Sequence, residues 1–262
     1  MKLWVKFYSN RPQLVDDLDN TPIFKIPWGH NREIITKTKT VDEALFYVYK
    51  TIENNWSRNV LLNQIESGLY ERQGKAINNF DISLPEPQSD LAKEILKDPY
   101  NFDFLTLKEI YNEKQLEDAL IENITNFLLE LGTGFSYVGR QYKLVIDDEE
   151  FYIDLLFYHI RLHSYVVIEL KTGKFKPEYA GKLNFYVSAV DDMLKTEQDN
   201  PTIGILICKE RNKTIVEYAL RDISKPIGVS QYVLTKSLPE HYKNLLPSID
   251  QLSRELNSLD GE

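Results

Sequence analysis

The sequence predicts a mixed α/β fold, in which a small helical N-terminal domain precedes a mixed sheet that helices flank. Two observations predict it. In the first half, apolar residues recur with helical spacing, whereas the second half alternates strand-like apolar runs with amphipathic helices. The composition, with 42% hydrophobic and 27% charged residues, is typical of a folded globular protein and excludes disorder throughout the chain.

The N-terminal half predicts three helices. The first spans Val41–Asn55, where apolar residues fall at helical intervals, and the second spans Arg58–Ser67, with Ser57 as its N-cap and Gly68 as its end. Residues 78–87 contain asparagines and two prolines and predict a loop. A short helix over Gln88–Lys97 follows.

The second half predicts one long helix over Glu113–Leu131, which Gly132 closes, and then a sheet. The expected strands are Phe135–Val138, Gln141–Ile146, Phe151–Tyr158, Ser164–Leu170, Thr202–Cys208 and Gly228–Leu234, and the expected later helices are Pro177–Leu194 and Asn212–Arg221. The resulting division is a helical domain at 1–103, an α/β domain at 104–236 and a C-terminal helical tail at 237–262.

Several classes of protein are not expected. No apolar run approaches the roughly 18 residues of a membrane helix, and the start of the chain lacks the features of a secretory signal. The single cysteine, Cys208, excludes a disulfide framework and fits a cytoplasmic location. The net charge of −9 argues against coating of nucleic acid over the whole surface, although it leaves room for a local basic groove.

The strand Phe151–Tyr158 carries one anomalous residue. Strict alternation places Phe151, Ile153, Leu155 and Phe157 on one face and Asp154 on the other, and both faces are otherwise apolar. A central strand is therefore expected to bury an ionised carboxylate, which costs several kcal/mol unless it is paired or binds a metal.

The next strand repeats the anomaly. Glu169 and Lys171 project from the same face at its end, and an adjacent strand would bring Glu169 close to Asp154. Two carboxylates so close favour a shared divalent cation, and Mg²⁺ prefers such oxygen ligands, with Mn²⁺ as a substitute. Lys171 would then hold an attacking water or stabilise charge on a phosphoryl group. The alternatives are a structural pair of Asp154 with Arg140 or Arg161, and an edge-of-sheet ion pair of Glu169 with Lys171.

A third carboxylate comes from the helix Glu113–Leu131. At about 100° per residue, Glu117 falls inside the apolar stripe, whereas Asp118 and Glu122 fall on the solvent side. We therefore expect Glu117 to act at the sheet face. The alternative is that its side chain only reaches past the edge of the core.

These residues resemble the PD-(D/E)XK nuclease superfamily, with Asp154 followed after fourteen residues by Glu169-Leu170-Lys171. Longer phrases are similar to the YhcG-like subfamily of predicted bacterial nucleases, and the similarity runs from about Pro27 to Leu234. The phrases are Trp56-Ser-Arg-Asn-Val60, Gln64-Ile-Glu-Ser-Gly-Leu-Tyr-Glu-Arg-Gln-Gly74, Val138-Gly-Arg-Gln141 and Pro177-Glu-Tyr-Ala-Gly-Lys182. The resemblance implies a restriction-endonuclease-like sheet.

The resemblance also implies roles for the residues. Asp154, Glu169 and the Leu170 carbonyl would hold the metal, Lys171 would orient or activate water, and Glu117 would complete the outer metal shell. Many members carry a Gln-x-x-x-Tyr motif on the next helix, where this chain has Lys182 and Tyr186. The proline of the family name is replaced by Ile153.

Phosphate contacts are expected from lysines near the site. Lys174, Lys176 and Lys182, with Lys171, give four lysines within twelve residues. In the N-terminal half, the two helices around Asn54–Trp56 resemble a helix-turn-helix, in which Arg58 and Asn59 could read base edges. The alternatives are a solvated lysine loop and a helical packing or dimerisation module.

The predicted function is Mg²⁺-dependent hydrolysis of phosphodiester bonds in nucleic acid, with DNA expected rather than RNA. One alternative is a nucleic-acid-binding module that keeps the fold without cleaving. Another is a helical adaptor subunit of a defence or repair assembly. No nucleotide-binding Gly-rich loop is visible, and no membrane partner is expected. A homodimer is compatible with cutting a duplex.

Overall fold

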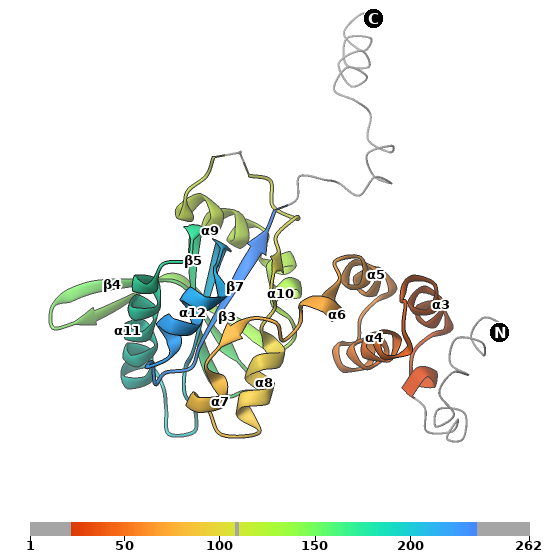
Figure 1. The fold of residues 1–262 in the computed structure, drawn as a ribbon, viewed down its shortest axis with the longest axis horizontal. Helices are drawn as coiled ribbons and strands as arrows, with labels where there is room; N and C mark the ends of the chain where they lie inside the picture. Colours follow the sequence, from red (N-terminus) through yellow and green to blue (C-terminus); the bar gives the residue numbers. More distant parts are fainter. Residues whose placement is uncertain (1–21, 108–109, 235–262) are drawn as a thin grey trace, which may run out of the picture.

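A seven-stranded sheet forms the centre of the protein in a computed structural model that describes residues 22–107 and 110–234 (Figure 1). The order across the sheet is β1-β7-β6-β5-β4-β3, and β2 pairs with β7. The strands are β1 (Ile77–Asn78), β2 (Tyr100–Asn101), β3 (Phe135–Ile146), β4 (Glu149–His159), β5 (Ser164–Lys174), β6 (Ile203–Glu210) and β7 (Ile227–Val233). Strands β5, β6 and β7 are parallel, whereas β3, β4 and β5 are antiparallel. The prediction of a mixed α/β fold is confirmed.

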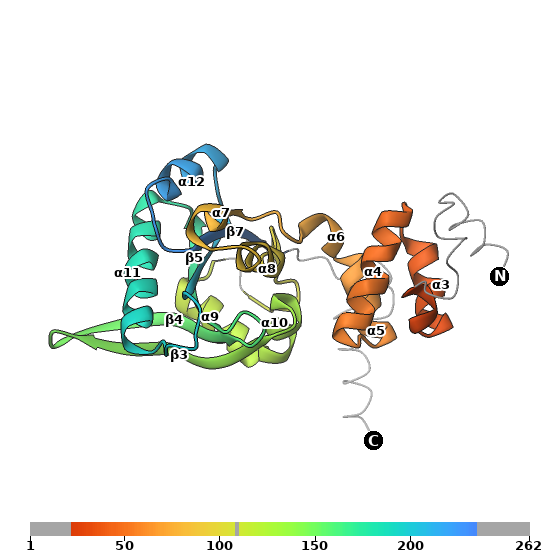
Figure 2. The ribbon, with the colours of Figure 1, turned by 90° about the horizontal axis from the view of Figure 1, so that it is seen from below.

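The N-terminal helices form a separate cluster beside the sheet (Figures 1 and 2). After the 3-10 turn η2 (Pro22–Lys25) come α3 (Trp28–Lys37), α4 (Val41–Asn54), α5 (Arg58–Glu66) and the short α6 (Leu69–Arg72). Thr40 caps α4 and Ser57 caps α5 through their hydroxyl groups. Apolar residues of these helices, such as Ile34, Tyr47 and Leu61, form a core of their own.

Residues 76–103 contribute to the sheet although the sequence division assigns them to the helical domain. Strands β1 and β2 pair with β7, and α7 (Phe80–Ser83) and α8 (Gln88–Ile95) lie between them. The prediction of a loop over 78–87 is therefore wrong for the α7 segment, where Asn78 and Asn79 start a short helix instead of a turn. The predicted tail at 237–262 lies outside the described residues.

The expected helix over Glu113–Leu131 is two helices, α9 (Glu113–Glu122) and α10 (Ile124–Leu131). The break falls at Asn123, whose side-chain amide donates to the carbonyl of Ala119 and whose backbone leaves helical geometry. A short polar side chain that competes for backbone hydrogen bonds explains the interruption. The two strands predicted over 135–146 are instead one strand, β3, with a register shift between Tyr137 and Gly139.

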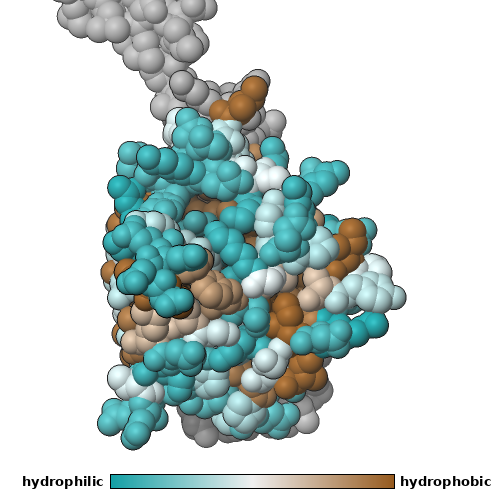
Figure 3. Space-filling view, turned by 90° about the vertical axis from the view of Figure 1, so that its left-hand side faces the viewer, coloured by the Kyte–Doolittle hydropathy of each residue, from teal (hydrophilic) through white to brown (hydrophobic). Residues whose placement is uncertain are grey.

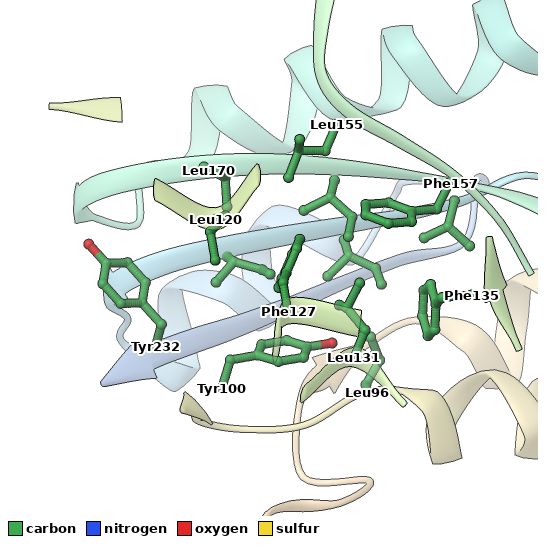
Figure 4. Close-up of a cluster of buried hydrophobic side chains, with 14 of the residues drawn as sticks. Leu96, Tyr100, Leu120, Phe127, Leu131, Phe135, Leu155, Phe157, Leu170 and Tyr232 are labelled. Carbon is green, nitrogen blue, oxygen red and sulfur yellow. The ribbon is translucent and has the colours of Figure 1, made fainter. Parts of the chain in front are cut away.

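Two hydrophobic cores cover the two faces of the sheet. The first packs α9 and α10 against residues such as Leu155, Phe157 and Leu170 (Figure 4). The second packs α11 (Pro177–Met193) and α12 (Lys213–Leu220) against the other face. Both cores are built from fully buried aliphatic and aromatic side chains, which fix the strands that carry the candidate site.

The predicted alternation along β4 is wrong at one point. Ile153 packs in the second core and Leu155 in the first, although they are two residues apart. The core that β4 contacts therefore changes between Ile153 and Leu155, and beyond this point the β3–β4 hairpin packs toward α11, where Phe151 contacts Phe185. Alternation along β5 is as predicted, since Val166, Ile168 and Leu170 share the first core and Val167 lies in the second.

No helix in the part of the chain that the structure describes is long and apolar enough to cross a membrane.

Candidate active site

Asp154 and Glu169 lie on neighbouring antiparallel strands. Leu155 of β4 pairs with Ile168 of β5, and continuing that register places Asp154 opposite Glu169. The backbone N–H of Leu170 donates to Oδ2 of Asp154 at 2.9 Å, which fixes the carboxylate at this edge of the pairing. The sequence-based expectation that adjacent strands bring the two carboxylates together agrees with this geometry.

The Lys171 ammonium lies among three oxygen atoms of this strand pair. Its Nζ is 2.8 Å from the carbonyl oxygen of Leu170, 3.3 Å from Oε2 of Glu169 and 3.9 Å from Oδ2 of Asp154. These oxygens belong to the three residues that the resemblance assigns to a metal ion. Lys171 is therefore a cation that lies where those oxygens converge.

Glu169 is fully buried and only partly satisfied. Its Oε2 accepts from Lys171 and, at 3.0 Å, from Lys182, whereas its Oε1 is buried without a hydrogen-bond partner. Burial raises the pKa of the Glu169 carboxyl and the nearby Asp154 adds to the rise, while the two lysines oppose it. A buried carboxylate oxygen with no donor is the kind of group that a cation would satisfy.

Glu117 reaches the same region from α9. Its side chain is buried, at 4% exposure, and Oε2 accepts a hydrogen bond from the side-chain amide of Gln141. Burial raises the pKa of Glu117, the Gln141 hydrogen bond lowers it, and the negative charge of Asp154 raises it further. Its neighbour Asp118 is exposed and pairs with Arg140, as the helical stripe predicts.

The structural pairs proposed as alternatives for Asp154 do not form. Arg140 bonds to Asp118 and Arg161 bonds to Glu53. His159 at the end of β4 is buried, and burial lowers its pKa to about 4. Its ring nitrogen contacts the carbonyl of Thr133.

The lysines predicted to contact phosphate divide into two groups. Lys174 and Lys176 are 79% and 59% exposed and lie near Glu210 and Glu178, respectively. Lys182 turns inward to Glu169 and lies 5.0 Å from the ring centre of the buried Tyr186. The side of the molecule that presents α11 and the β3–β4 hairpin is largely hydrophilic, with small apolar areas between (Figure 3).

Arg58 and Asn59 are not part of this cluster. They lie at the start of α5, on the helical cluster beside the sheet (Figure 1), and both are exposed. Arg58 bonds to Glu33 of α3. Helices α4 and α5 match the two helices predicted here, and residues 55–57 lie between them, with Asn55 in a left-handed backbone conformation.

Two residues near the site were missed by sequence reasoning. Glu113, at the start of α9, accepts from the N–H and the hydroxyl of Thr172, and so ties the end of β5 to that helix. Gln141 bonds to Glu117 from β3. The phrase that contains Gln141 was already distinctive, but only the pairing of β3 with β4 gives it a position.

The oxygen donors of Asp154, Glu169 and Leu170 are of the kind that a hard divalent cation accepts. No group of three His, Cys, Asp or Glu side chains that could hold a metal is found in residues 22–107 and 110–234. Mg²⁺ keeps several waters and needs only one or two carboxylates, which Asp154 and Glu169 provide. The unpartnered Oε1 of Glu169 and the Leu170 carbonyl add further oxygen donors.

Comparison with known proteins identifies related sequences over most of the chain. Residues 93–247 match the YhcG PDDEXK nuclease domain, and residues 1–72 match the DUF1016 N-terminal domain. The YhcG protein of Escherichia coli (strain K12), named as a candidate nuclease, is 35% identical over 204 residues. That similarity covers 76% of this chain and 54% of the relative, so the chain spans about half the length of the curated relative it matches.

Solved structures resemble parts of the chain. A repair endonuclease from Pyrococcus abyssi shares 14% identity with a TM-score of 0.32, over 50% of this chain and 49% of that one. A structure of EndoMS in complex with double-stranded DNA shares 17% identity with a TM-score of 0.35, over 52% and 50% of the two chains. These overlaps are partial, and the family assignment rests on the sequence matches.

Proposed function

The chain belongs to the YhcG family of PD-(D/E)XK nucleases, and we propose that it is a divalent-metal-dependent nuclease that hydrolyses phosphodiester bonds in DNA. The observation that carries the proposal is the convergence of Asp154, Glu169 and the Leu170 carbonyl around the Lys171 ammonium. Two acidic groups that can hold a metal ion, with an amine beside them, are residue types that can catalyse phosphodiester hydrolysis.

Each residue has a proposed task. Asp154, Glu169 and the Leu170 carbonyl would hold Mg²⁺ or Mn²⁺, which supplies activation of water and neutralisation of phosphate charge when bound. When those oxygens hold the metal, the Lys171 ammonium no longer contacts them but remains next to the site. There it stabilises negative charge on the phosphoryl oxygens. Glu117 orients water at the outer side of the site through its carboxylate.

The basic residues near the site support nucleic acid as the substrate. Lys174 and Lys176 are exposed, and their ion pairs with Glu210 and Glu178 are of the surface kind that contributes about 1 kcal/mol or less. They can therefore exchange these partners for backbone phosphates. We propose Lys182 and Tyr186 as a phosphate contact next to Glu169, and Arg58 and Asn59 as a separate contact on α5.

Cleavage of labelled double-stranded DNA, single-stranded DNA and RNA with Mg²⁺ or Mn²⁺ tests the proposal. We expect DNA cleavage by the wild type, and a loss on the order of a thousandfold in Asp154→Ala and Lys171→Ala. Asp118→Ala is the matched control, because this carboxylate lies next to Glu117 on α9 but points to Arg140. It should cleave like the wild type.

The alternatives correspond to other outcomes. Metal-independent DNA binding without cleavage would favour the non-cleaving binding module. Neither binding nor cleavage, together with capture of a defined protein partner by the helical region, would favour the adaptor.

A further inference from the structure

Gln141 occupies an unusual position on β3. Arg140 pairs with Leu155 and Tyr142 pairs with Ile153, so the register places Gln141 opposite Asp154. Gln141 is thus the β3 residue next to Asp154, at the point where β4 passes from contact with one core to contact with the other.

The backbone of Gln141 is left-handed, with φ of 44°. A residue other than glycine rarely adopts this conformation inside a strand, and it costs on the order of 1 kcal/mol or more. A register shift lies just before it, between Tyr137 and Gly139. Irregularities of this kind occur next to active sites, where they redirect a side chain.

The redirected side chain reaches Glu117. The amide Nε2 of Gln141 lies 2.5 Å from Oε2 of Glu117, and among the described residues no other side chain donates to that carboxylate. The Gln141 amide that contacts Glu117 carries no charge. A lysine or arginine would cancel the charge of Glu117, whereas an amide holds the carboxylate in place and leaves its charge available to a cation or a water.

We propose that Gln141 is a positioning residue, which holds the Glu117 carboxylate beside Asp154 against the repulsion between the two acids. The strained backbone of β3 at Gln141 serves this contact. The proposal rests on the proposed function, because the positioning concerns the metal site formed by Asp154 and Glu169. Without the amide, the Glu117 side chain turns away from Asp154 and the outer part of the site loses its order.

The experiment measures Mn²⁺ affinity by calorimetry and unfolding by urea for the full chain. Gln141→Met keeps the length of the side chain and removes the donor. We expect its Mn²⁺ affinity to fall about tenfold to a hundredfold, as for the loss of other residues that orient metal ligands, together with a modest fall in its urea midpoint, because Glu117 loses a hydrogen bond. A purely structural role would move the midpoint and not the affinity.

Two further variants complete the design. Gln141→Asn suits the left-handed backbone but is one methylene too short, so it should lose affinity with the fold retained even if Gln141→Met is unstable. Lys143→Met is the matched control, because Lys143 is exposed two residues along β3 and bonds to Glu150. It should bind Mn²⁺ like the wild type.

The variant Asp154→Ala tests the proposed metal site separately from the positioning role of Gln141. If it loses Mn²⁺ binding while Gln141→Met and Gln141→Asn bind like the wild type, the positioning role is overturned and the proposed function stands. If Asp154→Ala itself binds Mn²⁺ like the wild type, the proposed metal site is wrong and the positioning role falls with it.

Discussion

The buried ion pair between α6 and α10 and the carboxylates of the candidate site are both ionic clusters inside the protein, but their charges are satisfied to different degrees. Arg72 bonds to Glu130 at 2.6 Å, to the carbonyl of Pro99 and to Ser67, and Glu130 also accepts from the N–H of Asn101. In the candidate site, Glu169 has an oxygen without any donor.

The difference separates a structural cluster from the proposed metal site. In the first, every charge has several partners, and the cluster ties the end of the helical region to the sheet domain. In the second, two acids lie close together, and one oxygen of Glu169 has no hydrogen-bond partner although two lysines contact the other. Of these two clusters, only the candidate site has a carboxylate oxygen that is buried without a hydrogen-bond partner.

The largest expected effect on stability comes from breaking the first cluster. Arg72→Met should lower the free energy of unfolding by about 3–5 kcal/mol, because it leaves the Glu130 carboxylate buried without its charged partner. Urea denaturation measures the change. Arg140→Met, which breaks an exposed pair with Asp118, is the control and should cost about 1 kcal/mol or less. If Arg72→Met lowers the free energy of unfolding no more than this control does, the cluster does not have the structural role given to it here.

A smaller effect is expected in the candidate site. Without metal, Glu169→Gln should change the free energy of unfolding by less than about 1 kcal/mol, since it removes a buried charge while also removing a partner of Lys171 and Lys182. Lys182 is 44% exposed and can turn to water. Urea denaturation in a chelating buffer measures the change, and a loss as large as that of Arg72→Met would show that Glu169 is mainly structural.

Much of the site follows from elementary patterns in the sequence. Single acids in apolar strands identified Asp154 and Glu169, and the helical stripe identified Glu117 as buried. The lysine that turns inward was not predictable in this way. Lys182 was expected to face phosphates, and its contact with Glu169 depends on how α11 packs over β5.

The pairing of Gln141 with Asp154 can be deduced from the sequence, but only if the turn between β3 and β4 is given its correct bounds. Asp147 and Asp148 both have positive φ and form a two-residue hairpin turn, with Ile146 opposite Glu149. From that register, Gln141 lies opposite Asp154. The strands expected from the sequence, Gln141–Ile146 and Phe151–Tyr158, leave all of residues 147–150 as the connection, and that longer connection hides the pairing. The helix break at Asn123 has a local cause, the hydrogen bond of its side chain to Ala119, whereas the change of face at Asp154 depends on tertiary packing.

The most direct test of the central claim is a crystal structure of the chain grown with Mn²⁺, in which anomalous scattering locates the ion. The account predicts one strong peak within about 2.5 Å of carboxylate oxygens of Asp154 and Glu169 and of the Leu170 carbonyl, with the Lys171 ammonium moved away from those oxygens. A structure with Mn²⁺ bound elsewhere, or with Lys171 still on the Leu170 carbonyl at saturating Mn²⁺, would contradict it.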